Sequence, residues 1–287
     1  MERDASRWPL AYEGVGLSEH LARVAVLAAV LFEEDLRVLS RRTGLSELDA
    51  VLVSSALLHD TGKALRYYYS RWRSGRGEGG GLKFPFHEVV SALVVYFSAR
   101  GADANTLERL TLVSKIVARH HAAMHCRHPK DIAESRPGSG PCSDRLKELE
   151  DVLARAGDSE SIEHMRRALS DALGMLESHL EHRGELVEKV STLVEPVVSK
   201  LSTAAQIVES EREHVRRVLA DLEKSIPPVL SLSGMLIVAD NLAAGLCEPR
   251  DPSSLPVYTV YWRSELKRRI LESRGVLEEL CPRLLQE

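Results

Sequence analysis

A histidine and an aspartate stand side by side at the end of a strongly apolar segment of the sequence. Residues 51–58 have the composition of a buried helix, and His59 and Asp60 follow directly. Gly62 comes two residues later, and glycine commonly ends helices. Imidazole nitrogen and carboxylate oxygen together suit divalent transition metals, and a carboxylate has a second oxygen that can bridge two ions. We therefore expect metal ligands where a buried helix meets a loop. The alternative is a charge pair at a helix end.

Two further histidines lie where predicted helices begin. Ser18 has the residue type of an N-cap, so His20 falls in the first turn of a helix that we expect to continue to residue 43. His87 opens a helix predicted over residues 87–99. A histidine at a helix start is common without any ligand role, and that alternative stays open for both residues.

A pair of adjacent histidines and one aspartate complete the series. His120 and His121 end the helix predicted from Thr106, where the alternative is two solvated side chains favoured by the helix dipole. Asp240 interrupts the apolar helix predicted over residues 229–244. Burying an unpaired carboxylate there would cost several kcal/mol, so Asp240 needs a partner. A metal ion is well suited, and an arginine is the alternative.

The order of these residues resembles the HD superfamily of metal-dependent phosphohydrolases. Within that superfamily, the chain is similar to the CRISPR-associated HD nucleases, the nuclease part of type I interference. The similarity is carried by residues 57–63, 86–92, 120–121 and 239–241, and it spans roughly residues 18–244. The sequence has no GxxxxGKS or GxxxxGKT phosphate-binding loop and no room for helicase lobes. The chain therefore resembles the stand-alone form of these nucleases.

The resemblance implies a two-metal site with named ligands. One ion would be held by His20, His59, Asp60 and Asp240, and a second by Asp60 together with His87, His120 and His121. Asp60 would then bridge the ions, and Lys63 could neutralise charge on a scissile phosphate. A plain surface lysine is the alternative for Lys63. Two divalent ions are expected, with Mn or Mg in use and Ni, Co or Fe as alternatives.

A basic and aromatic segment follows the His-Asp pair. Over residues 66–85 the helical pattern fails and glycines accumulate, which predicts a mobile loop. Basic side chains track a phosphate backbone and aromatic rings stack on bases, as expected for single-stranded nucleic acid. The alternative is a surface loop whose tyrosines pack on the core. The expected nucleic-acid contacts are Arg66, Tyr68, Arg71, Trp72, Arg73 and Arg76.

No segment shows sustained alternation of apolar and polar residues, so we expect an all-α fold. The predicted architecture is an HD-domain helical bundle with an additional charged helical lobe, forming one domain over residues 1–287. The metal-site core covers residues 18–125 and 229–245, with a helical insertion at about 143–225. A C-terminal helix at about 257–281 is expected to face the core, or alternatively to dock a partner subunit.

Composition limits the cellular setting. The net charge is −4, no run of about 18 apolar residues predicts a membrane span, and the N-terminus lacks a signal-peptide pattern. The four cysteines are widely spaced without a CxxC motif, which favours a cytoplasmic protein and leaves a Cys126–Cys142 disulfide open. Asparagine and glutamine each occur only twice. This depletion indicates a thermophile, although the excess of arginine over lysine fits genomic base composition equally well.

The resemblance implies a metal-dependent nuclease that hydrolyses phosphodiester bonds of single-stranded DNA in antiviral defence. The expected partners, implied by the resemblance, are a separate helicase subunit and an RNA-guided CRISPR complex, with no membrane. One alternative is an HD phosphohydrolase acting on nucleotides or cyclic nucleotides, against which the basic aromatic segment weighs. Another is an inactive metal-binding scaffold subunit, against which the complete series of ligands and Lys63 weigh.

Overall fold

The computed structural model describes residues 8–12, 14–74, 81–121, 142–224, 226–247 and 268–269. Helices dominate these ranges, which confirms the all-α prediction. The strands among them are β1 (Leu10–Tyr12) and β2 (Val15–Gly16), which pair antiparallel just before the first helix. Nearly all of the C-terminal helix predicted at 257–281 lies outside the described residues.

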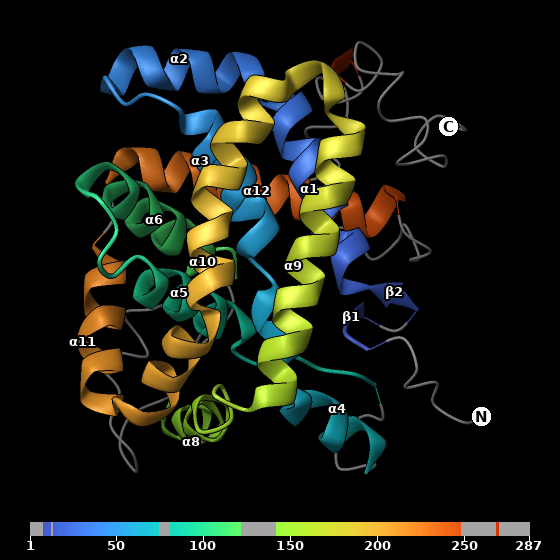
Figure 1. Cartoon of the computed structure of the whole chain (residues 1–287), viewed down its shortest axis with the longest axis vertical. Helices are drawn as coiled ribbons and strands as arrows, with labels where there is room; N and C mark the ends of the chain where they lie inside the picture. Colours follow the sequence, from blue (N-terminus) through green and yellow to red (C-terminus); the bar gives the residue numbers. More distant parts are fainter. Residues whose placement is uncertain are drawn as a thin grey trace.

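The centre of the bundle is α3 (Leu48–Leu58), the apolar helix that precedes the His-Asp pair. Every residue of α3 except Asp49 is buried, as expected for a helix that is apolar all round. It packs against α1 (Leu17–Leu31) and α6 (Ala104–Val117), and α5 (His87–Ser98) packs beside α6. Helix α12 (Pro227–Leu242) crosses behind α1 and α3 in Figure 1. These five helices carry the predicted metal ligands, so the core fixes their positions.

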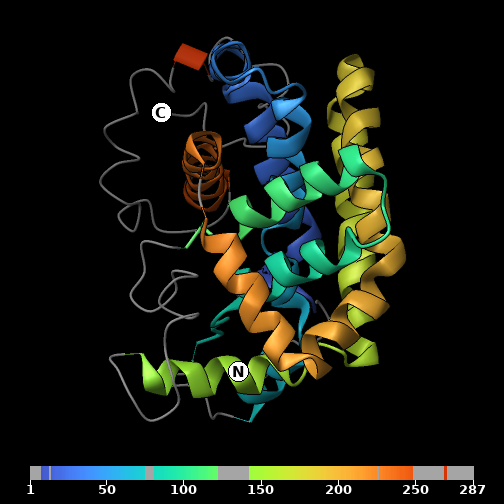
Figure 2. The same cartoon turned by 90° about the vertical axis from the view of Figure 1, so that its left-hand side faces the viewer.

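The charged segment after residue 142 folds into four helices that cover the core. These are α8 (Ser143–Leu153), α9 (Ser159–His179), α10 (Gly184–Ser210) and α11 (Arg212–Glu223). Helix α9 runs along α1, and α10 packs on α3 and α5. Figures 1 and 2 show α9 and α10 together on one side of the central helices. Buried residues recur at helical spacing on α9, including Met165, Leu169 and Leu176. Their burial makes these helices one wall of the bundle.

Several predicted helix starts were wrong because packing and neighbouring caps decide them. Helix α1 begins at Leu17 with Gly16 as N-cap, so Ser18 is inside the helix and makes no cap hydrogen bond. Asp103 caps α6, and its carboxylate accepts hydrogen bonds from the backbone of Asn105 and Thr106. Thr106 is therefore not the cap. A carboxylate at this position satisfies two of the free N–H groups of the first turn.

The first predicted helix is also two helices, because the chain breaks at Phe32. Helix α2 (Glu33–Thr43) begins there and ends at Gly44, whose φ of 71° is left-handed, as a helix-ending glycine should be. Ser46 does not open the next helix, since α3 begins at Leu48 after Glu47.

The mobile loop predicted at residues 66–85 was wrong for its first half. Residues Arg66–Arg73 form helix α4, and Tyr68, Tyr69 and Trp72 are buried in it. The Tyr69 hydroxyl donates to the backbone carbonyl of Leu10 and accepts from the Leu10 N–H, which ties α4 to β1. The tyrosines therefore pack on the core, as the alternative interpretation of this segment expected.

Among the described residues, one helical segment, Pro227–Gly245, is long and apolar enough to cross a membrane by length and hydropathy. Half of it is buried against the rest of the protein, and a core helix meets the same criterion, so the finding is weak support for a span. Cys142 is disulfide-bonded, and Cys126, with which the sequence left a disulfide open, lies outside the described residues.

Replacing Leu169 by alanine tests whether α9 belongs to the core. Leu169 is fully buried, so we expect Leu169→Ala to lower the free energy of unfolding by about 2–5 kcal/mol. Leu107→Ala is the control, since Leu107 is an exposed leucine on α6, and we expect a change of about 0.5 kcal/mol or less. Urea unfolding followed by circular dichroism measures both. Equal effects of the two variants would contradict the packing described.

Candidate metal centre

The predicted ligands come from five different helices or the turns that follow them, and they converge. His20 lies in the first turn of α1, while His59 and Asp60 follow α3 directly. His87 is the first residue of α5. The helix predicted to reach His120 and His121 ends at Val117, so both residues lie in the turn after α6. Asp240 lies near the end of α12.

Two groups of potential ligands form, and they share Asp60. Within each group, one ligand atom per residue lies within 4.8 Å of the others. The first group is His20, His59, Asp60 and Asp240, and the second is Asp60, His87, His120 and His121. These groups match the two ligand sets expected from the sequence.

The two carboxylate oxygens of Asp60 face different histidines. Oδ1 lies 2.8 Å from Nε2 of His87 and 3.3 Å from Nε2 of His120. Oδ2 lies 3.3 Å from Nε2 of His20 and 3.4 Å from Nε2 of His59. A single carboxylate thus stands between two sets of ring nitrogens. This is the arrangement that a carboxylate bridging two ions requires.

Backbone carbonyls orient three of the histidines in the same way. In each, Nδ1 lies within hydrogen-bond distance of the carbonyl three residues earlier, and because a carbonyl can only accept, Nδ1 carries the proton. The contacts are His59 to Ala56 at 2.7 Å, His87 to Phe84 at 2.5 Å, and His120 to Val117 at 2.7 Å. In the neutral ring, Nε2 is then left with its lone pair directed at the site, which is how metal-binding histidines are usually held.

The buried ring nitrogens and carboxylate oxygens of the site are better placed to bind a metal ion than to hydrogen-bond one another. Nε2 of His59, His87 and His120 and both oxygens of Asp60 are buried and lie close to one another, but none of them makes a well-oriented hydrogen bond among the described residues. Asp60 is only 1% exposed and His59 is fully buried. Buried polar groups left in this state are costly, and divalent cations would satisfy all of them. The mixture of imidazole and carboxylate suits Mn, Fe, Co, Ni or Zn better than ions that prefer oxygen alone.

Charge and burial act in opposite directions on the ionisable groups. Burial alone would lower the pKa of His59, but the charges of Asp60 and Asp240 outweigh it and raise this pKa to about 10. Burial would raise the pKa of Asp60, yet the charges of His59 and Lys63 hold it well below its usual value. The pKa of His121 is lowered, first by burial and then by the neighbouring His120. Burial also lowers the pKa of His87, against the charge of Asp60. The charged histidine of the site is therefore His59, whose proton a cation bound there would displace.

A second network ties the turn after α3 to the start of α5. The turn continues as a short 3₁₀ helix, η1 (Thr61–Ala64), which contacts α5. A Cβ added to Gly62 would lie 2.3 Å from the His87 carbonyl oxygen, so only glycine permits this approach. The Gly62 N–H donates to Ser91 Oγ at 2.8 Å, and the Ser91 hydroxyl donates to the His87 carbonyl at 2.9 Å. Gly62 was predicted to end a helix. Its role here is to let Asp60 and His87 come together.

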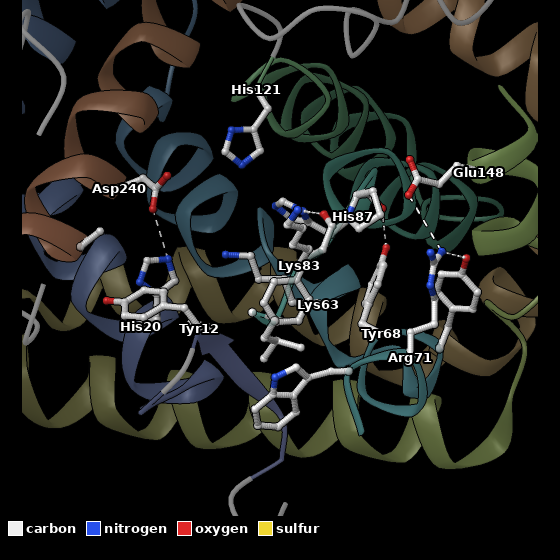
Figure 3. Close-up of a pocket in the computed structure, with 18 of the residues that line it drawn as sticks. Tyr12, His20, Lys63, Tyr68, Arg71, Lys83, His87, His121, Glu148 and Asp240 are labelled. Carbon is white, nitrogen blue, oxygen red and sulfur yellow. Dashed lines mark hydrogen bonds and ion pairs between the residues drawn. The ribbon is translucent and has the colours of Figure 1, made fainter. Parts of the chain in front are cut away.

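An open cleft of about 780 Å³ leads to the ligands. Figure 3 shows His20 and Asp240 at one end, Lys63 and His87 in the middle, and Arg71 at the other end. The Lys63 ammonium lies 2.5 Å from Asp60 Oδ2 and lines the cleft. The site is therefore buried around the carboxylate and accessible from one side.

The predicted nucleic-acid contacts separate into three groups. Tyr68, Arg71 and Trp72 line the cleft, although the two aromatic side chains are otherwise buried and expose little ring surface for stacking on bases. Arg66 and Arg73 are exposed but do not line the cleft, and Arg66 pairs with Glu160. Arg76 lies outside the described residues.

Several residues that line the cleft were missed by the sequence analysis. They are Tyr12 from β1, Lys83 just before α5, Arg145 and Glu148 from α8, and Asn241 beside Asp240. Arg145 and Glu148 belong to the charged segment without motifs and have common surface residue types, and Tyr12 precedes the helix that carries His20. Lys83 in the basic segment and Asn241 beside Asp240 were the residues with a usable signal.

Comparison with known proteins identifies one related family. Residues 11–245 match the family model described as "Cas3, HD domain". Searches of curated proteins and of solved structures returned no match. The matched region contains both ligand groups and the helices α8 to α11.

Metal stoichiometry tests whether Asp60 is shared. We expect the protein to bind two Mn²⁺ ions, and His121→Ala and Asp240→Ala to bind one each, because each variant loses a ligand of a single group. Asp60→Ala should weaken both sites. Isothermal titration calorimetry of metal-free protein gives the stoichiometry, with His182→Ala, an exposed histidine, as control. One tight site left intact in Asp60→Ala would rule out the shared carboxylate.

Metal affinity should rise with pH. Since the pKa of His59 in the metal-free protein is about 10, His59 is protonated at neutral pH and must lose that proton to bind a metal. We expect the Kd for Mn²⁺ to fall by about tenfold per pH unit between roughly pH 6 and pH 8, with protons released on binding. A pH indicator in weakly buffered solution measures the release. Affinity independent of pH, without proton release, would contradict this charge state.

Proposed function

Because the chain belongs to the Cas3 HD domain family, we propose that it is a metal-dependent nuclease that hydrolyses phosphodiester bonds of single-stranded DNA in CRISPR type I interference. The observation that carries this proposal is that the two carboxylate oxygens of Asp60 face two separate sets of histidines. Two adjacent cation sites with a common carboxylate suit in-line displacement at a phosphodiester.

Most of the candidate site residues would bind metal, and Lys63 would contact the substrate. One ion would be held by His20, His59, Asp60 and Asp240, and the other by Asp60, His87, His120 and His121. When bound, two divalent ions acidify water and stabilise the charge that develops on the attacking and leaving oxygens. The first set has two histidines and two aspartates, and the second has three histidines and one aspartate. We propose Mn or Mg as the ions in use, with Ni, Co or Fe as alternatives.

Lys63 would act on the substrate. Its ammonium group lies at the edge of the carboxylate, 12% exposed, and faces the cleft. A cation at that position can attract the phosphate and offset its negative charge as the bond to the leaving group breaks. In this proposal Lys63 stabilises charge and Asp60 bridges the ions.

The cleft favours an extended substrate over a small one. It is open, about 780 Å³, and has cationic side chains beyond the metal ligands, including Arg71, Lys83 and Arg145. The phosphates of a nucleotide lie close to one another, whereas a strand carries a phosphate at every nucleotide, so cationic side chains spread along the cleft fit a strand better. The same proposal has the chain working in the cytoplasm beside a separate helicase subunit and an RNA-guided complex.

Cleavage of end-labelled single-stranded DNA tests the function directly. We expect the purified protein to cut the DNA with Mn²⁺, and Asp60→Ala to reduce the rate at least about a thousandfold, because that variant loses a ligand of both sites. Lys63→Ala should reduce the rate by roughly ten- to a thousandfold with metal binding retained. Chelator removes activity in every case.

Controls separate the nuclease from the alternatives. Single-stranded RNA, nucleotides and cyclic dinucleotides are tested in parallel. Hydrolysis of nucleotides without cutting of DNA would favour the small-molecule phosphohydrolase. Metal-loaded protein that hydrolyses none of them would contradict an autonomous enzyme and favour the scaffold.

A further inference from the structure

We propose that Arg71 and Arg145, joined by Glu148, form a phosphate-binding subsite at the end of the cleft away from His20 and Asp240. The subsite would take the backbone of a single-stranded polynucleotide at a nucleotide other than the one being cut. This inference rests on the proposed function and adds to it a binding element supplied by helix α8.

The subsite and the metal centre belong to one continuous cleft. His20, His87, His121 and Asp240 line it together with Arg71, Arg145 and Glu148. In Figure 3, His20 and Asp240 lie at one end, while Arg71 and Glu148 lie at the opposite end. A ligand that reaches both ends must extend along the cleft, as a chain of linked phosphates does.

Glu148 holds the two arginines beside each other. Arg145 Nη1 donates to Glu148 Oε2 at 2.8 Å, and Arg71 Nη1 lies 4.0 Å from Glu148 Oε1. Arg71 Nη1 also donates to the Tyr67 hydroxyl at 2.6 Å. These contacts fix the position of each guanidinium, so less side-chain freedom is lost when a ligand binds.

Both guanidinium groups keep donors for a ligand. A guanidinium has five N–H donors in a planar fork that matches two phosphate oxygens, and the contacts described above use Nη1 alone. Arg71 is 41% exposed and Arg145 is 50% exposed, so water or a ligand reaches them. Arg71 from α4 and Arg145 from α8 therefore present converging donors at the wall of the cleft.

The charge of the cleft as a whole favours an anion. Its described lining includes the cationic side chains of Lys63, Arg71, Lys83 and Arg145 against the carboxylates of Glu148 and Asp240, a surplus of positive charge in a concave surface, although the charge of Asp151 also acts on Arg71. Such a surplus raises the local concentration of a polyanion and supplies affinity that depends on salt rather than on base sequence. Because Tyr68 and Trp72 are largely buried, we expect the subsite to contact the phosphate backbone of the strand more than its bases.

Binding of a labelled oligonucleotide in chelator tests the subsite without catalysis. The probe is a fluorescent oligodeoxythymidylate of about 20 nucleotides, longer than a minimal single-strand site. Arg145→Gln should weaken binding by roughly three- to tenfold and reduce the slope of log Kd against log salt by about 1. Glu148→Gln should tighten binding, since it removes a negative charge from this end of the cleft while the side-chain amide oxygen can still accept the hydrogen bond from Arg145.

Arg37→Gln is the matched control. Arg37 is 57% exposed and also pairs with a glutamate three residues away in its helix, Glu34. It lies on α2, at the opposite end of the molecule from α4 and α8 (Figure 1). We expect Arg37→Gln to bind the oligonucleotide like the unaltered protein. Circular dichroism confirms that each variant is folded.

The outcomes separate the subsite from the nuclease function. Equal affinity of Arg145→Gln and Arg37→Gln, or no tightening in Glu148→Gln, would overturn the subsite, and DNA cutting that depends on Asp60 would still support the nuclease. Failure of the unaltered protein to bind the oligonucleotide would also overturn the subsite. A parallel titration with oligouridylate distinguishes a DNA strand from an RNA strand, and equal binding of both is the result expected for backbone contacts.

Discussion

The structure depends on one buried carboxylate that faces histidines on both sides. Asp60 is 1% exposed, and its surroundings supply three imidazole Nε2 atoms within 3.3 Å and the Lys63 ammonium. A charged group in this position is stable only when its partners stay in place. The helices that carry those partners must therefore keep a fixed relation to the turn after α3.

The fold meets this constraint with helix ends rather than with loops. Each ligand stands at or near the end of a helix whose body is packed in the core, and backbone carbonyls fix the ring orientation of three histidines. Gly62 and Ser91 then set the distance between Asp60 and His87. Gly62 has no Cβ to clash with the His87 carbonyl, and the Ser91 hydroxyl links the two backbones by hydrogen bonds. Such a preorganised set of ligands loses little freedom when metal binds.

The candidate ligands could be named from the sequence because their residue types carry the chemistry, and the structure brings them into two groups. Histidines at predicted helix ends and an aspartate inside the apolar α12 are informative wherever the helices pack. The start of α12 was predicted two residues late, at 229, because the two prolines were expected to lie before the helix, whereas Pro227 is its first residue. The wall of the cleft could not be predicted in the same way, since Arg145 and Glu148 are ordinary surface residues until α8 is placed beside α4. Helix α4 was missed because glycines after residue 74 suggested a loop, although Tyr68, Tyr69 and Trp72 have helical spacing.

The most direct test of this account is the electron paramagnetic resonance spectrum of the protein loaded with two equivalents of Mn²⁺. Two ions that share Asp60 would be close enough to couple their spins. We predict a spin-coupled signal in the unaltered protein, replaced in Asp60→Ala by the six-line signal of isolated Mn²⁺. A spectrum of isolated ions in the unaltered protein at full occupancy would contradict the shared carboxylate at the centre of the site.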